Sequence, residues 1–225
     1  MFKIFVFLVN NLKLLKHFSK NDLDQLPSRQ RAHLINSCTG YKSTNLLGTK
    51  SLGGSTNLAL FNSVIHIGSN PPLVGFILRP LTVKRNTYSN FKETGVFTVN
   101  QVHKNIIKQA HHTSASYEEG TSEFTKTGLG ESYIDDFPAP YVTESAIKIG
   151  CRYVNEYEIK ENGCLLIIGT IEHIYVPKTA LHEDGWVQLD KVDTVTTIGL
   201  DGYALPSLLS RFAYARPDEE TRSLL

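Results

Sequence analysis

The sequence predicts a mainly-β protein whose antiparallel strands form a closed or half-closed barrel with a few short flanking helices. Sixteen glycines and nine prolines, spread over 225 residues, separate short runs rich in β-branched and aromatic residues. Between residues 146 and 176, an alternating run and an apolar run are joined by Asn162-Gly163, which is typical of a β-hairpin. Helical patterns are too sparse for a doubly wound sheet, so a barrel is favoured.

The elements expected in the first part of the chain follow from local signals. Ser19 or Asn21 is a suitable cap for a short helix that ends before Pro27. Strands are then expected within residues 32–41, 43–51, 56–69 and 72–80. The apolar period of the third of these slips near Phe61 and Asn62, which indicates a bulge or a bend at a barrel corner.

Helix signals are clearest just after the last of these strands. Residues 86–94 are predicted to be helical, with Asn86 or Thr87 as the cap and Gly95 just past the end. A strand is expected next, then a helix, a loop, a proline-bounded connector and the hairpin; these lie within residues 96–103, 104–120, 121–130, 136–145 and 146–176.

The domain organisation is expected to be simple. Residues 1–18 form an N-terminal extension, disordered or not native, whose apolar run is short for a signal peptide and is broken by Asn10 and Asn11. Residues 19–225 form a single domain. From about Pro177 it ends in a mostly irregular extension, with one or two helical turns within residues 205–212.

Composition excludes several function classes. A net charge of +1 gives no field that favours nucleic acid or an anionic membrane. No apolar run approaches the roughly 18 residues of a spanning helix. Cys38, Cys151 and Cys164 show no C-x-x-C spacing. They are expected to be reduced thiols, which indicates a cytoplasmic protein.

Motifs that would define a familiar active site are absent. The sequence has no dinucleotide-binding G-x-G-x-x-G, no phosphate loop, no H-E-x-x-H and no G-x-S-x-G. His103, His111 and His112 lack Cys or carboxylate partners at metal-binding spacings. No metal site is expected, and the sequence identifies no catalytic side chain.

A basic stretch at residues 79–90 is the strongest chemical signal. Arg79, Lys84 and Arg85 lead into the start of the predicted helix, and Thr87 adds a hydroxyl there. A helix start offers free N–H groups and a positive dipole end, and an arginine adds donors that match phosphate oxygens. An exposed basic loop beside an ordinary helix cap accounts for the same residues, and both interpretations stay open here.

Residues 48–100 resemble the flavin reductase-like family, the FMN-binding split barrels that include the reductase components of two-component monooxygenases. Four elements carry the resemblance in the family's order: an N-x-A…S strand, a P-P-x-x-x-F strand, a basic residue with T-x-x-N at a helix start, and G-x-F-x-V-N. Here they are Asn57, Ala59 and Ser63; Pro71, Pro72 and Phe76; Arg85, Thr87 and Asn90; and Gly95, Phe97, Val99 and Asn100. Compatible segments extend from about residue 30 to 176.

The resemblance implies an antiparallel, Greek-key-like split β-barrel that binds FMN rather than FAD. Asn57, with main-chain groups of Leu58 and Ala59, would bond the pyrimidine edge of the flavin or its ribityl chain. Asn62 or Ser63 would reach the ribityl chain or the phosphate.

The resemblance also gives the basic stretch a role. Arg85, Thr87 and the helix start would hold the phosphate, with Arg79 as a helper. Thr49 and Lys50 are placed near the ring by chain order alone, and the role of Phe61 is open. The predicted cofactor-binding set is Thr49, Asn57, Leu58, Ala59, Phe61, Asn62, Ser63, Arg79, Arg85, Thr87 and Asn90.

The implied activity is an NAD(P)H:flavin oxidoreductase, in which the flavin does the redox chemistry. His111 or His112 would line the nicotinamide face, although a solvated helix end accounts better for both. The alternatives are a flavin-binding electron-transfer protein without its own nicotinamide site, and a split barrel that has lost its flavin. Expected partners are a second copy in a homodimer, a nicotinamide nucleotide, and a partner oxygenase or other electron acceptor.

Overall fold

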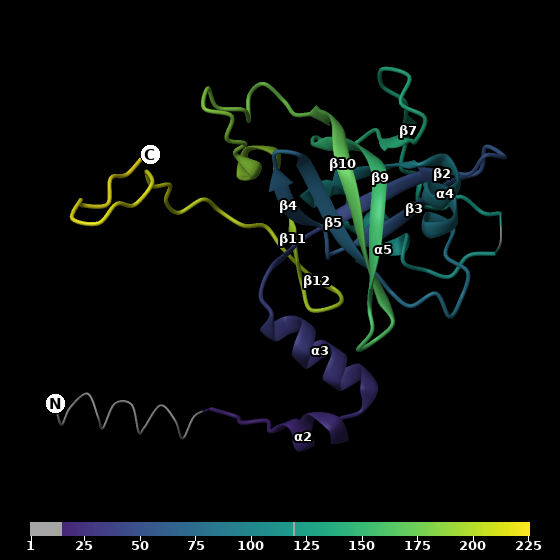
Figure 1. The fold of residues 1–225 in the computed structure, drawn as a ribbon, viewed down its shortest axis with the longest axis horizontal. Helices are drawn as coiled ribbons and strands as arrows, with labels where there is room; N and C mark the ends of the chain where they lie inside the picture. Colours follow the sequence, from purple (N-terminus) through teal and green to yellow (C-terminus); the bar gives the residue numbers. More distant parts are fainter. Residues whose placement is uncertain (1–14, 119) are drawn as a thin grey trace.

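The computed structural model describes residues 15–118 and 120–225, and antiparallel strands dominate it (Figure 1). The main sheet has seven strands in the order β3-β2-β6-β9-β10-β5-β4. Every neighbouring pair in it is antiparallel. These strands are β2 (Asn45–Lys50), β3 (Thr56–Phe61), β4 (Ile65–Ser69), β5 (Pro72–Leu78), β6 (Val96–Gln101), β9 (Lys148–Ile159) and β10 (Cys164–Tyr175).

Smaller elements surround this sheet. Two small sheets contain β1 (Lys42–Ser43), β11 (Thr196–Ile198) and β12 (Gly202–Ala204), and β7 (Glu131–Ser132) and β8 (Tyr141–Val142). The α-helices are α2 (Lys20–Gln25), α3 (Ser28–Cys38), α4 (Asn86–Thr94), α5 (Ile107–His112) and α6 (Glu123–Thr127). Two 3₁₀ turns are η1 (Lys104–Ile106) and η2 (Leu189–Val192).

The sheet curls until its two ends approach each other. Strands β3 and β4 follow one another in the chain but lie at opposite edges of the sheet. Where the curl closes, the rings of Phe61 and Phe76 meet edge to face with centroids 5.2 Å apart. The Ile77 N–H donates to Ser63 Oγ (3.1 Å), and that hydroxyl donates to the Ile77 carbonyl (3.2 Å). The ring contact joins the end of β3 to β5, and the hydroxyl contact extends the β4–β5 pairing into the corner. We call this region, formed by Phe61, Ser63, Phe76 and Ile77, the seam.

Two apolar clusters lie on opposite faces of the strands, because successive side chains of a strand alternate between faces. The inner cluster contains Leu47, Val74, Phe76, Leu78, Phe91, Phe97, Val99, Cys151 and Ile167. The outer cluster contains Leu46, Leu58, Val102, Ile106, Ala110, Phe124, Leu129, Val142 and Val195. Helix α4 contributes Phe91 to the inner cluster, whereas α5 and α6 cover the outer one. The barrel is therefore fixed on both sides of β2 and β3.

Several sequence predictions are confirmed. Strands β9 and β10 form the predicted hairpin, and Gly163 in its turn has φ +69°. Helix α4 covers the predicted residues and ends at Gly95, whose φ is +75°. The period slip near Phe61 marks the corner between β3 and β4. Ser19 caps α2 through a reciprocal bond with Asp22.

Several local predictions are wrong. The helix predicted within residues 104–120 is limited to η1 and α5 and ends at His112. Residues 32–38, predicted as strand, belong to α3, which Arg31 fastens to α2 by donating to carbonyls at the end of that helix. Residues 121–130 contain helix α6 rather than only loop, because Phe124 is drawn into the outer cluster. Residues 205–212 form no helical turn.

The predicted N-terminal extension falls mostly on residues 1–14, which lie outside the described part of the chain. Among residues 15–118 and 120–225, no helix has the length and apolarity to cross a bilayer.

Candidate functional site

Four of the predicted site residues are brought together where α4 packs on β2 and β3. Asn57 Nδ2 donates to Thr87 Oγ1 (2.9 Å), and Asn90 Nδ2 donates to Thr49 Oγ1 (3.1 Å). All four side chains are buried. Buried polar groups need such partners, so these two bonds fix the position of α4 against β2 and β3.

The start of α4 differs from the sequence prediction in one detail. Arg85, rather than Asn86 or Thr87, is the N-cap residue, and its side chain makes no capping bond to the helix. Its Nε donates instead to the Pro80 carbonyl (3.3 Å). Thr87 is turned toward Asn57 in the first turn. Arg85 and Thr87 thus both stand at the start of the helix, where its dipole is positive.

The corner between β3 and β4 uses its polar groups within the protein. Ser63 closes the seam through Ile77. Asn62 Nδ2 donates to the Gly199 carbonyl (3.4 Å), so this amide ties the corner to the β11–β12 turn. Arg79 is exposed one residue past the end of β5. Of the basic stretch, the structure thus brings Arg85 rather than Arg79 to the start of the helix.

The free edge of β3 shows a residue that the sequence analysis missed. The Leu58 N–H donates to Glu123 Oε2 (2.9 Å) from α6. Burial raises the pKa of this half-buried carboxyl, although the bond from Leu58 opposes the shift. Ser122 before the helix and Gly128 after it are helix-boundary signals from which α6 was predictable.

Lys50 lies at the far end of α4 from Arg85. Its Nζ is 4.8 Å from the centre of the Tyr133 ring. It lines a hollow with Ser51, Leu52, Glu93, Thr94, Tyr133, Asp136, Phe137 and Pro138. Because α4 has nine residues, its start at Arg85 and its end beside this hollow lie about 12 Å apart.

The three histidines considered in the sequence, His103, His111 and His112, lie at helix ends. For His111 and His112 this is the interpretation that the sequence favoured. The ring of His111 bonds the Tyr203 hydroxyl (2.8 Å), and His112 bonds Tyr117. His103 caps η1, accepting from the N–H of Asn105. Within the described residues, no group of three or more His, Cys, Asp or Glu side chains has the arrangement to hold a metal ion.

The curled antiparallel sheet, its seam and the helix bonded behind that seam define the class: a split-barrel protein. The flavin reductase like domain matches residues 41–193, which is more than half of the chain. The protein belongs to this family. Membership places it among the flavin-dependent oxidoreductases and confirms the family that the motif order indicated.

Solved structures agree with this assignment. A split-barrel protein of Shewanella frigidimarina NCIMB 400, assigned as a flavin reductase, is 45% identical with a TM-score of 0.86; 89% of this chain and all of that chain are covered. Component B of nitrilotriacetate monooxygenase from Bacillus cereus shares the fold at 18% identity and TM-score 0.75, over 88% and 98% of the two chains. Flavoredoxin of Desulfovibrio vulgaris (Miyazaki F) does so at 22% and 0.66, over 79% and 91%.

Proposed function

We propose that residues 19–225 form one FMN-binding domain that transfers hydride from NAD(P)H to flavin. The observation that carries this proposal is the start of α4, where Arg85 stands at the N-cap and Thr87 is bonded to Asn57 of β3. An arginine and a hydroxyl beside free helix N–H groups form a donor set suited to a phosphate monoester. Family membership supplies the flavin to which that phosphate belongs.

Different side chains would contact the phosphate and the rest of FMN. Thr87 Oγ1 already accepts a hydrogen bond from Asn57, so its own proton is free to be donated to a phosphate oxygen. Arg85 adds a charge-assisted donor at the same end. Asn57, Leu58, Ala59, Phe61, Asn62 and Ser63, which follow β3 into the corner, would contact the ribityl chain and ring, with Arg79 as an outer cation.

The other end of α4 would serve the ring. When bound, FMN supplies the redox centre, since its ring accepts hydride from the dihydronicotinamide. Lys50, at the end of the helix opposite Arg85, would place a positive charge beside the ring, which gains negative charge when it accepts hydride. Thr49 and Asn90, bonded to each other between the two ends, hold this spacing.

Flavin spectroscopy tests the proposal directly. We expect purified protein to carry FMN or to take it up to about one per chain, and NADH or NADPH to bleach the bound flavin without oxygen. Equilibrium dialysis at micromolar protein measures the uptake. Protein that retains no FMN, or bound flavin that neither nucleotide bleaches, contradicts the proposal.

Arg85 offers a sharper test, because riboflavin lacks the phosphate. We expect Arg85→Ala to weaken FMN binding by about 1.5–3 kcal/mol, or roughly ten- to a hundredfold. Riboflavin binding should be unchanged. Arg85→Lys should recover part of the loss, since an ammonium keeps the charge but not the planar fork. Fluorescence titration measures both ligands; an equal loss for FMN and riboflavin means that Arg85 does not contact the phosphate.

The shared fold with flavoredoxin favours a second candidate, a flavin-binding electron-transfer protein without its own nicotinamide site. The two candidates separate in the bleaching experiment. The electron-transfer protein holds FMN but stays oxidised with NAD(P)H until a reducing partner is added.

Assembly and location belong to the same proposal. We infer a homodimer in the cytoplasm that passes electrons to a partner oxygenase or another acceptor. The unpaired thiols of Cys38, Cys151 and Cys164 support the location. The shared fold with a monooxygenase component B supports the oxygenase. Two-fold dimers are the commonest homo-oligomers, and the exposed Ile65 and Ile67 of β4 supply apolar surface for one.

A further inference from the structure

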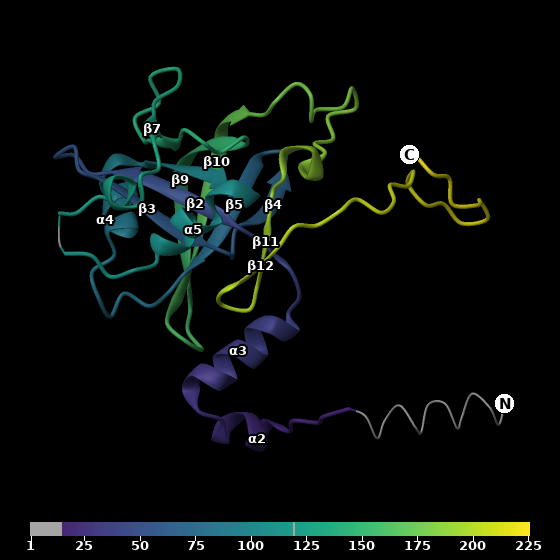
Figure 2. The same ribbon diagram turned by 180° about the vertical axis from the view of Figure 1, so that it is seen from behind.

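Residues 205–225, which we call the C-terminal arm, stand away from the barrel (Figures 1 and 2, yellow). The arm nevertheless has a defined shape. Its outer part folds back on itself, since Ala213 N–H donates to the Arg222 carbonyl and Leu224 N–H donates to the Arg211 carbonyl. A bridge pairs Phe212 with Ser223. The arm is therefore a formed element, although it is separate from the core.

Large apolar side chains of the arm face solvent. Leu209 is 89% exposed and Tyr214 is 92% exposed, and Phe212 is also exposed. Single exposed apolar residues are ordinary, but a formed element that carries several of them indicates an interaction surface.

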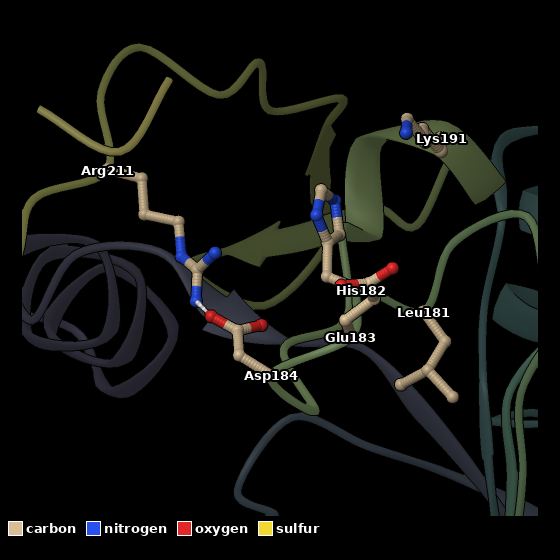
Figure 3. Close-up of a pocket in the computed structure, with 6 residues that line it drawn as sticks. All are labelled: Leu181, His182, Glu183, Asp184, Lys191 and Arg211. Atoms are coloured by element: carbon tan, nitrogen blue, oxygen red, sulfur yellow. Dashed lines mark hydrogen bonds and ion pairs between the residues drawn. The ribbon is translucent and has the colours of Figure 1, made fainter.

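Arg211 anchors the arm to the turn at residues 181–187. Figure 3 shows Arg211 reaching toward this turn, where it forms an ion pair with Asp184. The Arg211 guanidinium carbon also lies 4.4 Å from the centre of the Trp186 ring. The ring of His182 packs against the Trp186 ring, with the two ring centroids 4.9 Å apart. These contacts fix the direction in which the arm leaves the molecule.

The arm begins beside β4, an edge strand of the main sheet with one side unpaired in the described part of the chain. Among the described residues, β4 pairs with β5 alone, and Ile65 and Ile67 on it are exposed. Hydrogen bonds hold the hairpin at the root of the arm close to this strand. Asn62 of the corner donates to Gly199 between β11 and β12, and Ser43 of β1, which pairs with β11, donates to Val64 just before β4.

We propose that the arm of one copy of the chain packs on strand β4 of a second copy, and that the exchange is reciprocal. Because the root of the arm lies beside β4, a two-fold axis that brings two β4 strands near each other, without pairing them, lets each arm reach the β4 edge of the partner. An extended segment that adds to a free strand edge supplies the missing main-chain partners, while its apolar side chains cover Ile65 and Ile67. The proposal rests on the homodimer of the proposed function and names the segment that forms it.

Photo-crosslinking of the full-length chain tests where the arm lies. We replace Leu209 by p-benzoylphenylalanine, mix copies grown in ¹⁴N and ¹⁵N, irradiate and map the linked peptides by mass spectrometry. We expect links from the arm to residues 64–78 that join a ¹⁴N peptide to a ¹⁵N peptide. Links confined to one isotope, links to another surface, or the absence of linked dimers contradict the proposal.

Charge substitutions test whether the arm holds the dimer. We expect Leu209→Asp or Tyr214→Asp to raise the dimer dissociation constant at least about tenfold, which analytical ultracentrifugation over a dilution series measures. Thr221→Asp adds the same charge at another exposed position of the arm and should change nothing. An unchanged constant in both apolar variants overturns the proposal.

FMN titration of the same samples separates this proposal from the proposed function. Loss of dimer with FMN binding intact supports the role of the arm. Linked dimers that bind no FMN contradict the flavin proposal but still support the proposal for the arm.

Discussion

The two edge strands of the seven-stranded sheet differ in whether another part of the chain covers them. At β3, helix α6 covers the edge, Glu123 accepts the Leu58 N–H, and Phe124 beside it is 2% exposed. At β4, Ile65 is 50% exposed and no described strand pairs with the outer side. An open strand edge attracts other chains, so proteins cover it or keep it polar. The β3 edge, next to the candidate flavin site, is closed by its own chain, whereas the β4 edge is open and apolar.

The largest expected effect lies under the covered edge. Phe124→Ala should lower the free energy of unfolding by about 3–5 kcal/mol, because it empties a fully packed site in the outer cluster. Phe212→Ala is the matched control in the exposed arm and should change it by less than about 0.5 kcal/mol. Urea unfolding at a concentration where the chain is monomeric compares the two. Equal losses would mean that α6 does not close the β3 edge.

Removing the carboxyl that caps β3 should have the next largest effect. Glu123→Ala leaves the Leu58 N–H without its acceptor and should cost about 1–2 kcal/mol. Glu131 accepts a hydrogen bond from Thr56 on the same strand but is exposed. Glu131→Ala should therefore cost less than about 0.5 kcal/mol. The same urea experiment measures both, and the comparison fails if the exposed glutamate matters more.

The pH dependence of stability isolates the charge of Glu123. Its pKa is raised by burial, so the folded protein binds this proton more tightly than the unfolded chain. The free energy of unfolding should therefore fall as pH rises from the ordinary value of 4.5 through the raised pKa. Glu123→Gln still accepts from Leu58 but does not titrate, so it should remove this part of the slope. Glu161→Gln, at the exposed β9–β10 turn, is the control and should leave the pH dependence of the unfolding free energy unchanged. Urea unfolding curves between pH 4 and 8 measure this dependence for both variants.

The smallest effect on folding is expected at the open edge. Ile65→Ser should change the unfolding free energy of the monomer by less than about 0.5 kcal/mol, because half of this side chain is already in water. It should weaken the dimer, which ultracentrifugation of the same variant detects. A large loss of monomer stability would show that the β4 edge is packed within its own chain.

Local features of the fold were predictable from the sequence, and its long-range pairings were not. The Asn162-Gly163 turn and the Gly95 helix end need φ > 0, and glycine marks such positions clearly. The failed strand at residues 32–38 belongs to a helix that buries no residue, so its pattern carries no core signal. The order of the strands, which puts β3 and β4 at opposite edges, depends on contacts that no local pattern encodes.

The candidate site divides in the same way. Motif order alone placed Asn57 and Thr87 in one site, and the structure bonds them directly. The bond between Thr49 and Asn90 joins residues from segments that the sequence treats separately. Glu123 was not predicted because its role is to accept a main-chain N–H, and every residue type except proline supplies that donor.

The seam has a consequence for the order of events in folding. Its hydroxyl contact joins Ser63 to Ile77, 14 residues apart, whereas the buried amide of Asn100 bonds the Leu46 carbonyl across 54 residues in the middle of the sheet. Closing the longer loop costs about 1 kcal/mol more in chain entropy. Contacts between distant parts of a chain also form more slowly. We therefore expect the split side of the barrel to come together first and its continuous middle last.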